Sequence, residues 1–163
     1  MSQETSKDLR DLLIYQVYVR NYSKEGTLKA LEKDLLRIKA MGVDVLYLLP
    51  IHPIGEKNRK GKLGSPYAIK DYYGINEELG ELDDFKSLIK ATHKSGMKIM
   101  MDIVFNHTSH DSILSKEHPE YFYKRDGKFA NKVGDWWDII DLDYKHKALW
   151  TYLIDVLKFW TNL

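Results

Sequence analysis

Segments with the apolar pattern of a buried strand alternate along this chain with segments of helical periodicity. The strand-like segments are Leu12–Val19, Val43–Leu49 and Met97–Phe105, and each is rich in large or β-branched apolar side chains. This alternation favours parallel pairing of the strands, because each helix carries the chain back to the edge of the sheet where the previous strand began. The sequence therefore predicts an α/β fold built from three βα units.

Apolar side chains three or four residues apart mark the expected helices. Thr27 is the expected N-cap of the first helix, which Gly42 ends, and Asp83 is the expected N-cap of the second, which Gly96 follows. A last helix is expected over Lys145–Trp160. The apolar positions that define these helices are Leu28, Leu31, Leu35 and Ile38, then Phe85, Leu88, Ile89 and Thr92, then Leu149, Leu153, Val156, Leu157 and Trp160.

Two connections are longer than is usual in such folds. They cover about 50–80 and about 107–143, and both follow the carboxyl end of a strand, where α/β enzymes place their sites. The first carries a basic cluster among glycines, Lys57, Arg59, Lys60 and Lys62, which we interpret as a solvated loop. Both connections are rich in aromatic residues, which anchor loops to a core and suit the apolar faces of sugar rings. These residues are Tyr67, Tyr72, Tyr73, Tyr121, Phe122, Tyr123, Trp136 and Trp137.

Composition excludes several kinds of function. The net charge of +1 provides no field that would attract nucleic acid or an acidic membrane. The absence of cysteine excludes disulfides and cysteine-ligated zinc. No apolar run reaches the roughly 18 residues of a membrane span, and the polar start of the sequence, MSQETSKDLRD, lacks the apolar core of a signal peptide. We therefore expect a cytoplasmic protein with no nucleic-acid or membrane partner.

Short polar residues follow the third apolar segment directly. The stretch from Met97 to Ser109 reads MKIMMDIVFNHTS, so Asp102, Asn106 and His107 stand at the end of a strand. This stretch resembles the strand-three signature of the α-amylase family of glycoside hydrolases. The segment GSPYAIKDYY, from Gly64 to Tyr73, and the segment IIDLD, from Ile139 to Asp143, are similar to two further signatures of that family. Three matches in the family's order make the resemblance specific.

The resemblance implies roles for individual residues. Tyr67 would stack on the sugar at the cleavage point, and Asp71 with Tyr72 would form its framework. His107 would hydrogen-bond a sugar hydroxyl, a task that suits a neutral imidazole because it donates and accepts. Asp102 would organise the site through hydrogen bonds. These are binding and supporting roles, and the resemblance assigns no catalytic residue to the chain.

The resemblance also bears on metal binding. Asn106 resembles a calcium ligand of the calcium-dependent members, and Asp141 is a plausible second oxygen donor. Calcium takes about six to eight oxygen ligands, and only these two candidates have support from the family. We expect no required cofactor and treat calcium as an open alternative.

The implied fold is the first three βα units of a TIM (β/α)₈ barrel with a short inserted domain after strand three, at about 107–143 of residues 1–163. The implied substrate is α-glucan or malto-oligosaccharide, cleaved with retention. Such a reaction uses two carboxyl groups roughly 5 to 5.5 Å apart, which the family takes from later strands, so the 163-residue chain is expected to be inactive alone. A catalytically silent relative that uses the barrel for carbohydrate binding or partner assembly is the alternative.

The sequence constrains the substrate and the type of reaction less than it constrains the fold. Hydrolysis, transglycosylation and isomerisation share the same framework. Gly64, Ser65 and Pro66 precede Tyr67 where many exo-acting α-glucosidases have an acidic residue, which favours an amylase-like cleft. An isolated part of a barrel would also leave strand edges open, so the chain is expected to self-associate.

Overall fold

The computed structural model describes residues 6–163. They form two compact units, each made of two segments of the chain. The first unit contains residues 6–49 and 78–102, and the second contains residues 50–77 and 103–163. Among the described residues, no helix is both long enough and apolar enough to cross a membrane.

A parallel three-stranded sheet organises the first unit. Its strands are β1 (Ile14–Val17), β2 (Val45–Leu48) and β3 (Lys98–Met101), in the order β1-β2-β3. Ile14 pairs with Val45, and Val45 pairs in turn with Lys98. The predicted parallel α/β arrangement is confirmed.

The expectation of three buried strands holds only for β2. In β2 the side chains of Val45, Leu46 and Leu48 are buried, whereas β3 has no buried residue and β1 has only Val17. The outer strands each pair on one side only within the described sheet, which leaves them more accessible. The predicted strands were also too long, because Val19 begins helix α1 (Val19–Tyr22) and residues 102–105 are not in a strand.

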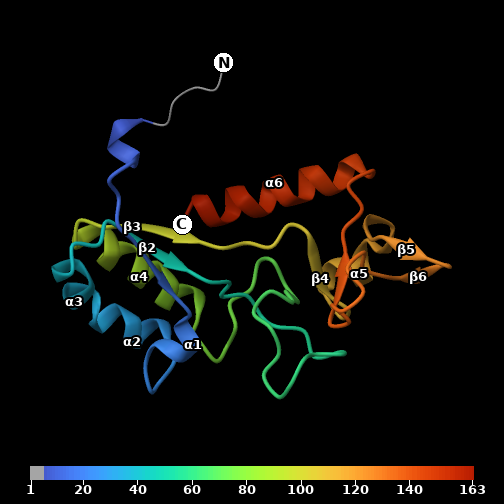
Figure 1. Cartoon of the computed structure of the whole chain (residues 1–163), viewed down its shortest axis with the longest axis horizontal. Helices are drawn as coiled ribbons and strands as arrows, with labels where there is room; N and C mark the ends of the chain where they lie inside the picture. Colours follow the sequence, from blue (N-terminus) through green and yellow to red (C-terminus); the bar gives the residue numbers. More distant parts are fainter. Residues whose placement is uncertain (1–5) are drawn as a thin grey trace. The chain divides into compact units, whose positions relative to one another are not determined.

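Helices lie together on one side of this sheet (Figure 1). They are α2 (Leu28–Lys33), α3 (Leu35–Ala40) and α4 (Leu82–Lys94), and α2 contacts α3 and α4, while α4 contacts β3. Thr27 caps α2 as predicted, since its hydroxyl accepts the N–H of Ala30. The predicted N-cap of α4 was wrong. Glu81 occupies that position and forms a capping box with Asp84, which places Asp83 inside the first turn.

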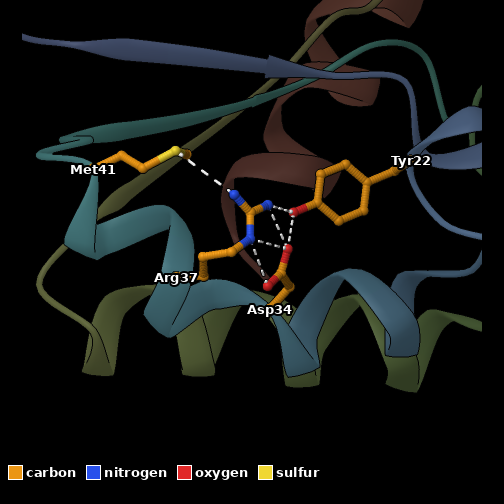
Figure 2. Close-up of polar contacts among 4 residues, drawn as sticks. All are labelled: Tyr22, Asp34, Arg37 and Met41. Atoms are coloured by element: carbon orange, nitrogen blue, oxygen red, sulfur yellow. Dashed lines mark hydrogen bonds and ion pairs between the residues drawn. The ribbon is translucent and has the colours of Figure 1, made fainter.

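The predicted first helix is interrupted at Asp34, which separates α2 from α3. Figure 2 shows the polar contacts made there by Asp34, Tyr22 and Arg37, with the Met41 sulfur beside the Arg37 guanidinium. The Arg37 guanidinium donates to both carboxylate oxygens of Asp34 and to the Tyr22 hydroxyl, and the hydroxyl donates to Asp34. Aspartate is a poor residue for a helix interior because its side chain competes for local hydrogen bonds. A 3₁₀-type bond from the Asp34 N–H to the Leu31 carbonyl marks the break.

The second unit contains more regular structure than its sequence predicted. Within the expected inserted loop or domain at about 107–143 lie the antiparallel pair β4 (His107–Ser109) and β7 (Ile139–Asp141) and the hairpin β5 (Lys124–Arg125) and β6 (Lys128–Phe129). The helix α5 (Ile113–Glu117) and the 3₁₀ turn Pro119–Tyr121 complete this part. Residues 50–77 form a loop within which Ile54 and Ile69 pair as an isolated antiparallel bridge.

Helix α6 (Lys147–Thr161) holds the loop at 50–77 within the second unit. Its buried face consists of Leu149, Leu153, Val156 and Trp160. The indole N–H of Trp160 donates to the carbonyl of Tyr72 at 2.7 Å, and its ring contacts the ring of His52 edge-on. The Tyr72 ring is buried and its hydroxyl donates to the carbonyl of Val104 at 2.7 Å. These contacts confirm the expectation that loop aromatics anchor the connection.

Candidate functional site

His107 is the centre of the candidate site and lies at the start of β4. Its register partner is Asp141 in β7, and its ring is largely buried. Nδ1 lies 3.0 Å from the amide nitrogen of Asn106, which can only donate, so Nδ1 is the acceptor. Its ring meets the ring of Trp136 edge-on at 5.8 Å between centroids.

The surroundings of His107 favour its neutral form. Burial lowers the pKa of the imidazole, and this effect exceeds the opposing influence of the Asp141 and Asp138 carboxylates and of a hydrogen bond with the Tyr67 backbone. A neutral imidazole with an accepting Nδ1 carries its proton on Nε2. The surroundings of His107 therefore favour a neutral imidazole, and its role in binding a sugar hydroxyl remains a prediction.

A cavity of about 330 Å³ adjoins this histidine within the second unit. Its volume is at the lower end of the range for small-molecule sites, about 300 to 1,000 Å³. Its lining includes Lys60, Ser65, Tyr67, His107, Trp136, Asp138 and Ile139. The two residues that the sequence nominated for contact with sugar, Tyr67 and His107, thus line the same cavity.

Lys60 and Asp138 are members of the cavity wall that the sequence did not nominate. The Lys60 ammonium lies 3.0 Å from a carboxylate oxygen of Asp138, which is buried, and 4.6 Å from the centre of the Trp137 ring. Lys60 is therefore a half-buried, ion-paired member of the basic cluster that we interpreted as a solvated loop. Its neighbours Lys57, Arg59 and Lys62 are exposed, as that interpretation requires.

Asp71 lies in the chain turn that follows Tyr67. The Oδ1 atom of Asp71 accepts the N–H of Tyr73 at 2.9 Å. The Oδ2 atom lies so close to Gly74 that a Cβ placed there would be 2.8 Å away. This turn leads into the buried Tyr72. Asp71 is not a member of the cavity lining, and its contacts fix the backbone beside it.

Of the candidate calcium ligands, Asp141 lies in β7 and Asn106 directly precedes β4, the strand paired with β7. The backbone carbonyl of Asn106 accepts the N–H of Leu142, and a carboxylate oxygen of Asp141 accepts the N–H of Lys132 at 2.8 Å. Among residues 6–163, no group of three or more histidine, cysteine, aspartate or glutamate side chains is arranged to hold a metal ion. Calcium takes about six to eight oxygen ligands, and calcium binding by these residues remains a prediction.

Asp102 belongs to the first unit, where it follows β3 directly. Its N–H donates to the carbonyl of Leu48 at 2.9 Å, which continues the β2–β3 ladder by one residue. Its carboxylate accepts a hydrogen bond from the Tyr47 hydroxyl, and burial together with this bond raises the pKa of Tyr47. The expected position at a strand end is confirmed, and the supporting role remains a prediction.

Solved structures similar to this chain include two amylases. An α-amylase from Lactobacillus plantarum is 60% identical with a TM-score of 0.91, over 93% of this chain and 36% of that one. A noncanonic maltogenic α-amylase, AmyB, from Thermotoga neapolitana is 42% identical with a TM-score of 0.89, over 94% of this chain and 37% of that one. The fold of the chain therefore matches a part of these enzymes.

Curated relatives include α-1,4-glucan:maltose-1-phosphate maltosyltransferases. That of Methylacidiphilum infernorum is 38% identical over 91% of this chain, and that of Picrophilus torridus is 35% identical over 91%. The chain spans about 26% of the length of each of these relatives. A family model described as the α-amylase catalytic domain matches residues 16–162. With this match over most of its length, the chain belongs to the α-amylase catalytic-domain family.

Proposed function

We propose that this chain forms part of an α-amylase-type enzyme that hydrolyses α-glucosidic bonds of starch-like glucans or malto-oligosaccharides. The observation that carries the proposal is the shared cavity of Tyr67 and His107. An exposed tyrosine ring beside a neutral imidazole provides an apolar face for a sugar ring and a hydrogen-bonding group for its hydroxyls. Trp136 adds a second aromatic surface to the same wall.

The proposal also assigns the elements to a barrel. We propose that β1, β2 and β3 are the first three strands of a (β/α)₈ barrel, and that residues of about 107–143 form the domain inserted after the third strand. The parallel order β1-β2-β3 and the antiparallel β4–β7 pair support this assignment. Asp102 would then stand at the carboxyl end of a barrel strand, the end at which barrel enzymes place their sites.

Hydrolysis is favoured over glycosyl transfer by the degree of similarity. The Lactobacillus plantarum α-amylase is 60% identical to this chain, whereas the maltosyltransferase of Methylacidiphilum infernorum is 38% identical. The Gly64-Ser65-Pro66 sequence before Tyr67 bears on a different choice: it lacks the acidic residue of many exo-acting α-glucosidases and so supports an amylase-like cleft.

The chemistry needs a nucleophilic carboxylate and a carboxylic acid roughly 5 to 5.5 Å apart. We assign neither group to residues 6–163. In the proposal this chain positions the sugar through Tyr67 and His107, while Asp102 supports the site. The 163-residue chain is expected to bind malto-oligosaccharide without turning it over.

The test compares the 163-residue chain with the product of the complete reading frame that encodes it. A chromogenic maltoheptaoside reports hydrolysis, and tryptophan fluorescence reports binding of maltotriose near Trp136. We expect turnover from the complete product and none from the 163-residue chain. Binding without turnover by the complete product would show a silent relative and overturn the proposal, and turnover by the shorter chain would overturn the assignment of the carboxylates.

Two variants test the cavity itself. Tyr67→Ala should weaken maltotriose binding about tenfold, since the loss of an aromatic stacking surface costs roughly 1.5 kcal/mol. Leu63→Ala is the matched control, because Leu63 is an exposed apolar residue of the same loop that lies outside the cavity lining. Equal binding by the two variants would remove Tyr67 from the proposed site.

A further inference from the structure

The Lys60–Asp138 ion pair has the features of a fixed binding group in the cavity wall. Asp138 is 4% exposed, and the ammonium of Lys60 lies 3.0 Å from its Oδ1 atom. The side chain of Lys60 is 38% exposed, so it remains accessible while its partner is buried. Both residues line the cavity that contains Tyr67 and His107.

The pair fixes a side chain that is otherwise flexible. A free lysine loses about 2 kcal/mol of rotamer entropy when it is held in one conformation. Here the Asp138 carboxylate and the face of the Trp137 ring, 4.6 Å from the ammonium, already restrict it. A ligand that meets a group ordered in advance does not have to supply that entropy, so its binding is tighter.

The ammonium retains hydrogen-bonding capacity for a ligand. It has three N–H donors, and its contacts given for residues 6–163 are the Asp138 carboxylate and the Trp137 ring. A sugar hydroxyl presents an oxygen that accepts such a donor. Because Lys60 stands in the same wall as Tyr67, a sugar ring stacked on the tyrosine would lie beside a charged donor.

Charge balance in the wall indicates which sugars fit. Lys60 contributes one positive charge, Asp138 one negative charge, and burial favours the neutral form of His107. The wall therefore has no net charge with which to compensate a phosphate group. A phosphorylated sugar placed there would lose hydration and would also lie near the Asp138 carboxylate.

We propose that Lys60 is a specificity-determining residue which, held by Asp138, donates a hydrogen bond to a hydroxyl of an uncharged glucosyl unit. The same ion pair selects against phosphorylated sugars because it leaves the cavity without net charge. This inference rests on the proposed function and adds a residue that discriminates between uncharged and phosphorylated sugars.

The first test measures the kinetics of the complete reading-frame product on a chromogenic maltoheptaoside. Lys60→Met keeps the length of the stem and removes the donor, so KM should rise about tenfold, the effect of losing one hydrogen bond from a charged group. The value of kcat should stay unchanged, because the lost contact is equal in the ground and transition states. The melting temperature should fall, because the buried Asp138 carboxylate loses its ion-pair partner. Lys60→Arg retains the cation and should recover most of the affinity.

Lys62→Met is the matched control, since Lys62 is an exposed lysine of the same loop outside the cavity lining. It should leave KM unchanged. A purely structural role for Lys60 would lower kcat in Lys60→Met, and Lys60→Arg would restore the melting temperature without restoring KM; that result would overturn the inference. An unchanged KM in Lys60→Met would overturn it as well.

The second test concerns charge. Maltose and maltose 1-phosphate are compared as competitors of the same reaction, and the unaltered enzyme should prefer maltose. Asp138→Asn removes the negative charge and leaves Lys60 uncompensated, so the preference should shift toward maltose 1-phosphate by about tenfold. An unchanged preference would contradict the charge-balance argument.

The outcomes separate the inference from the function on which it rests. Absence of hydrolysis by the unaltered complete product would overturn the proposed function. Hydrolysis with a KM that is insensitive to Lys60→Met would leave the proposed function standing and remove Lys60 from the binding wall.

Discussion

His107 and Asp141 occupy directly paired positions of the antiparallel β4–β7 ladder. The pairing places a carboxylate near a largely buried imidazole, and this carboxylate opposes the lowering of the imidazole pKa without reversing it. The short ladder therefore fixes the position of the residue at the centre of the candidate site, while burial of its ring favours the neutral form.

The neutral state of His107 can be measured directly. We expect its ring signals in an NMR pH titration to report a pKa below the ordinary value of 6.5, because burial penalises the charged form. Comparison with His107→Gln identifies the signals. A midpoint at or above 6.5 would contradict the electrostatic account of the site.

His52 is expected to limit stability in acid. Its ring is buried, Nδ1 lies 3.2 Å from the carbonyl of Gly74, and burial lowers its pKa from 6.5 to about 4. Between about pH 6.5 and about pH 4, this histidine binds a proton more readily in the unfolded chain than in the folded protein. Its contribution to the free energy of unfolding is therefore fully present above about pH 6.5 and is lost as the pH falls toward about 4. The loss amounts to about 3 kcal/mol.

Urea denaturation at pH 7 and pH 4.5 checks this expectation. His52→Asn keeps a hydrogen-bond donor but cannot take up a proton, so its stability should depend less on pH than that of the unaltered protein. His93→Asn is the control, because His93 is exposed in the last turn of α4. Identical pH dependence in the unaltered protein and in His52→Asn would contradict the assignment to His52.

Gly55 is expected to tolerate no side chain. A Cβ placed on it would lie 2.1 Å from the Cβ of Ser109 and 2.6 Å from a carboxylate oxygen of Asp111. Gly55→Ala should therefore destabilise the protein by about 2 kcal/mol, the usual cost of overpacking. Gly134→Ala is the matched control, since nothing lies within 4 Å of a Cβ at that position. Equal melting temperatures of the two variants would show that the close approach of the loop to β4 is not maintained.

The 163-residue chain is expected to self-associate through its outer strands. In the described sheet, β1 and β3 each have one free edge, and Ile14 is 51% exposed. Sedimentation velocity should show a species larger than 19.1 kDa whose amount rises with concentration. Ile14→Lys should reduce association, whereas Leu36→Lys, at an exposed position of helix α3, should not. A concentration-independent monomer would refute the expectation.

Calcium is expected to have no effect on the stability of this chain. Asp141 already accepts the N–H of Lys132, and Asn106 is the only other candidate ligand from the sequence. The melting temperature should be the same with calcium and with a chelator. A higher melting temperature in the presence of calcium, which Asp141→Asn abolishes, would instead establish the site that the resemblance suggested.

The sequence predicted the parts of this protein that depend on local pattern. Thr27 could be identified as a cap because its hydroxyl satisfies the N–H of a residue three positions away. The boundary of α4 was wrong because Glu81 and Asp83 are both acidic residues near the helix start, and only the capping box with Asp84 distinguishes them. The β5–β6 hairpin was missed, although Asp126-Gly127 is the usual signal for such a turn and both residues have positive φ.

The sequence by itself determined the parallel α/β organisation, the family resemblance and the nomination of Tyr67 and His107, because strand patterns and short motifs are properties of neighbouring residues. Only the tertiary structure joined Lys60 to Asp138 and His107 to Asp141. Each of these pairs joins residues far apart in the chain, and no local pattern encodes which distant residue a side chain will meet. The ion pair, the neutral imidazole and the cavity between them follow from long-range packing, and so does the charge that a ligand would encounter there.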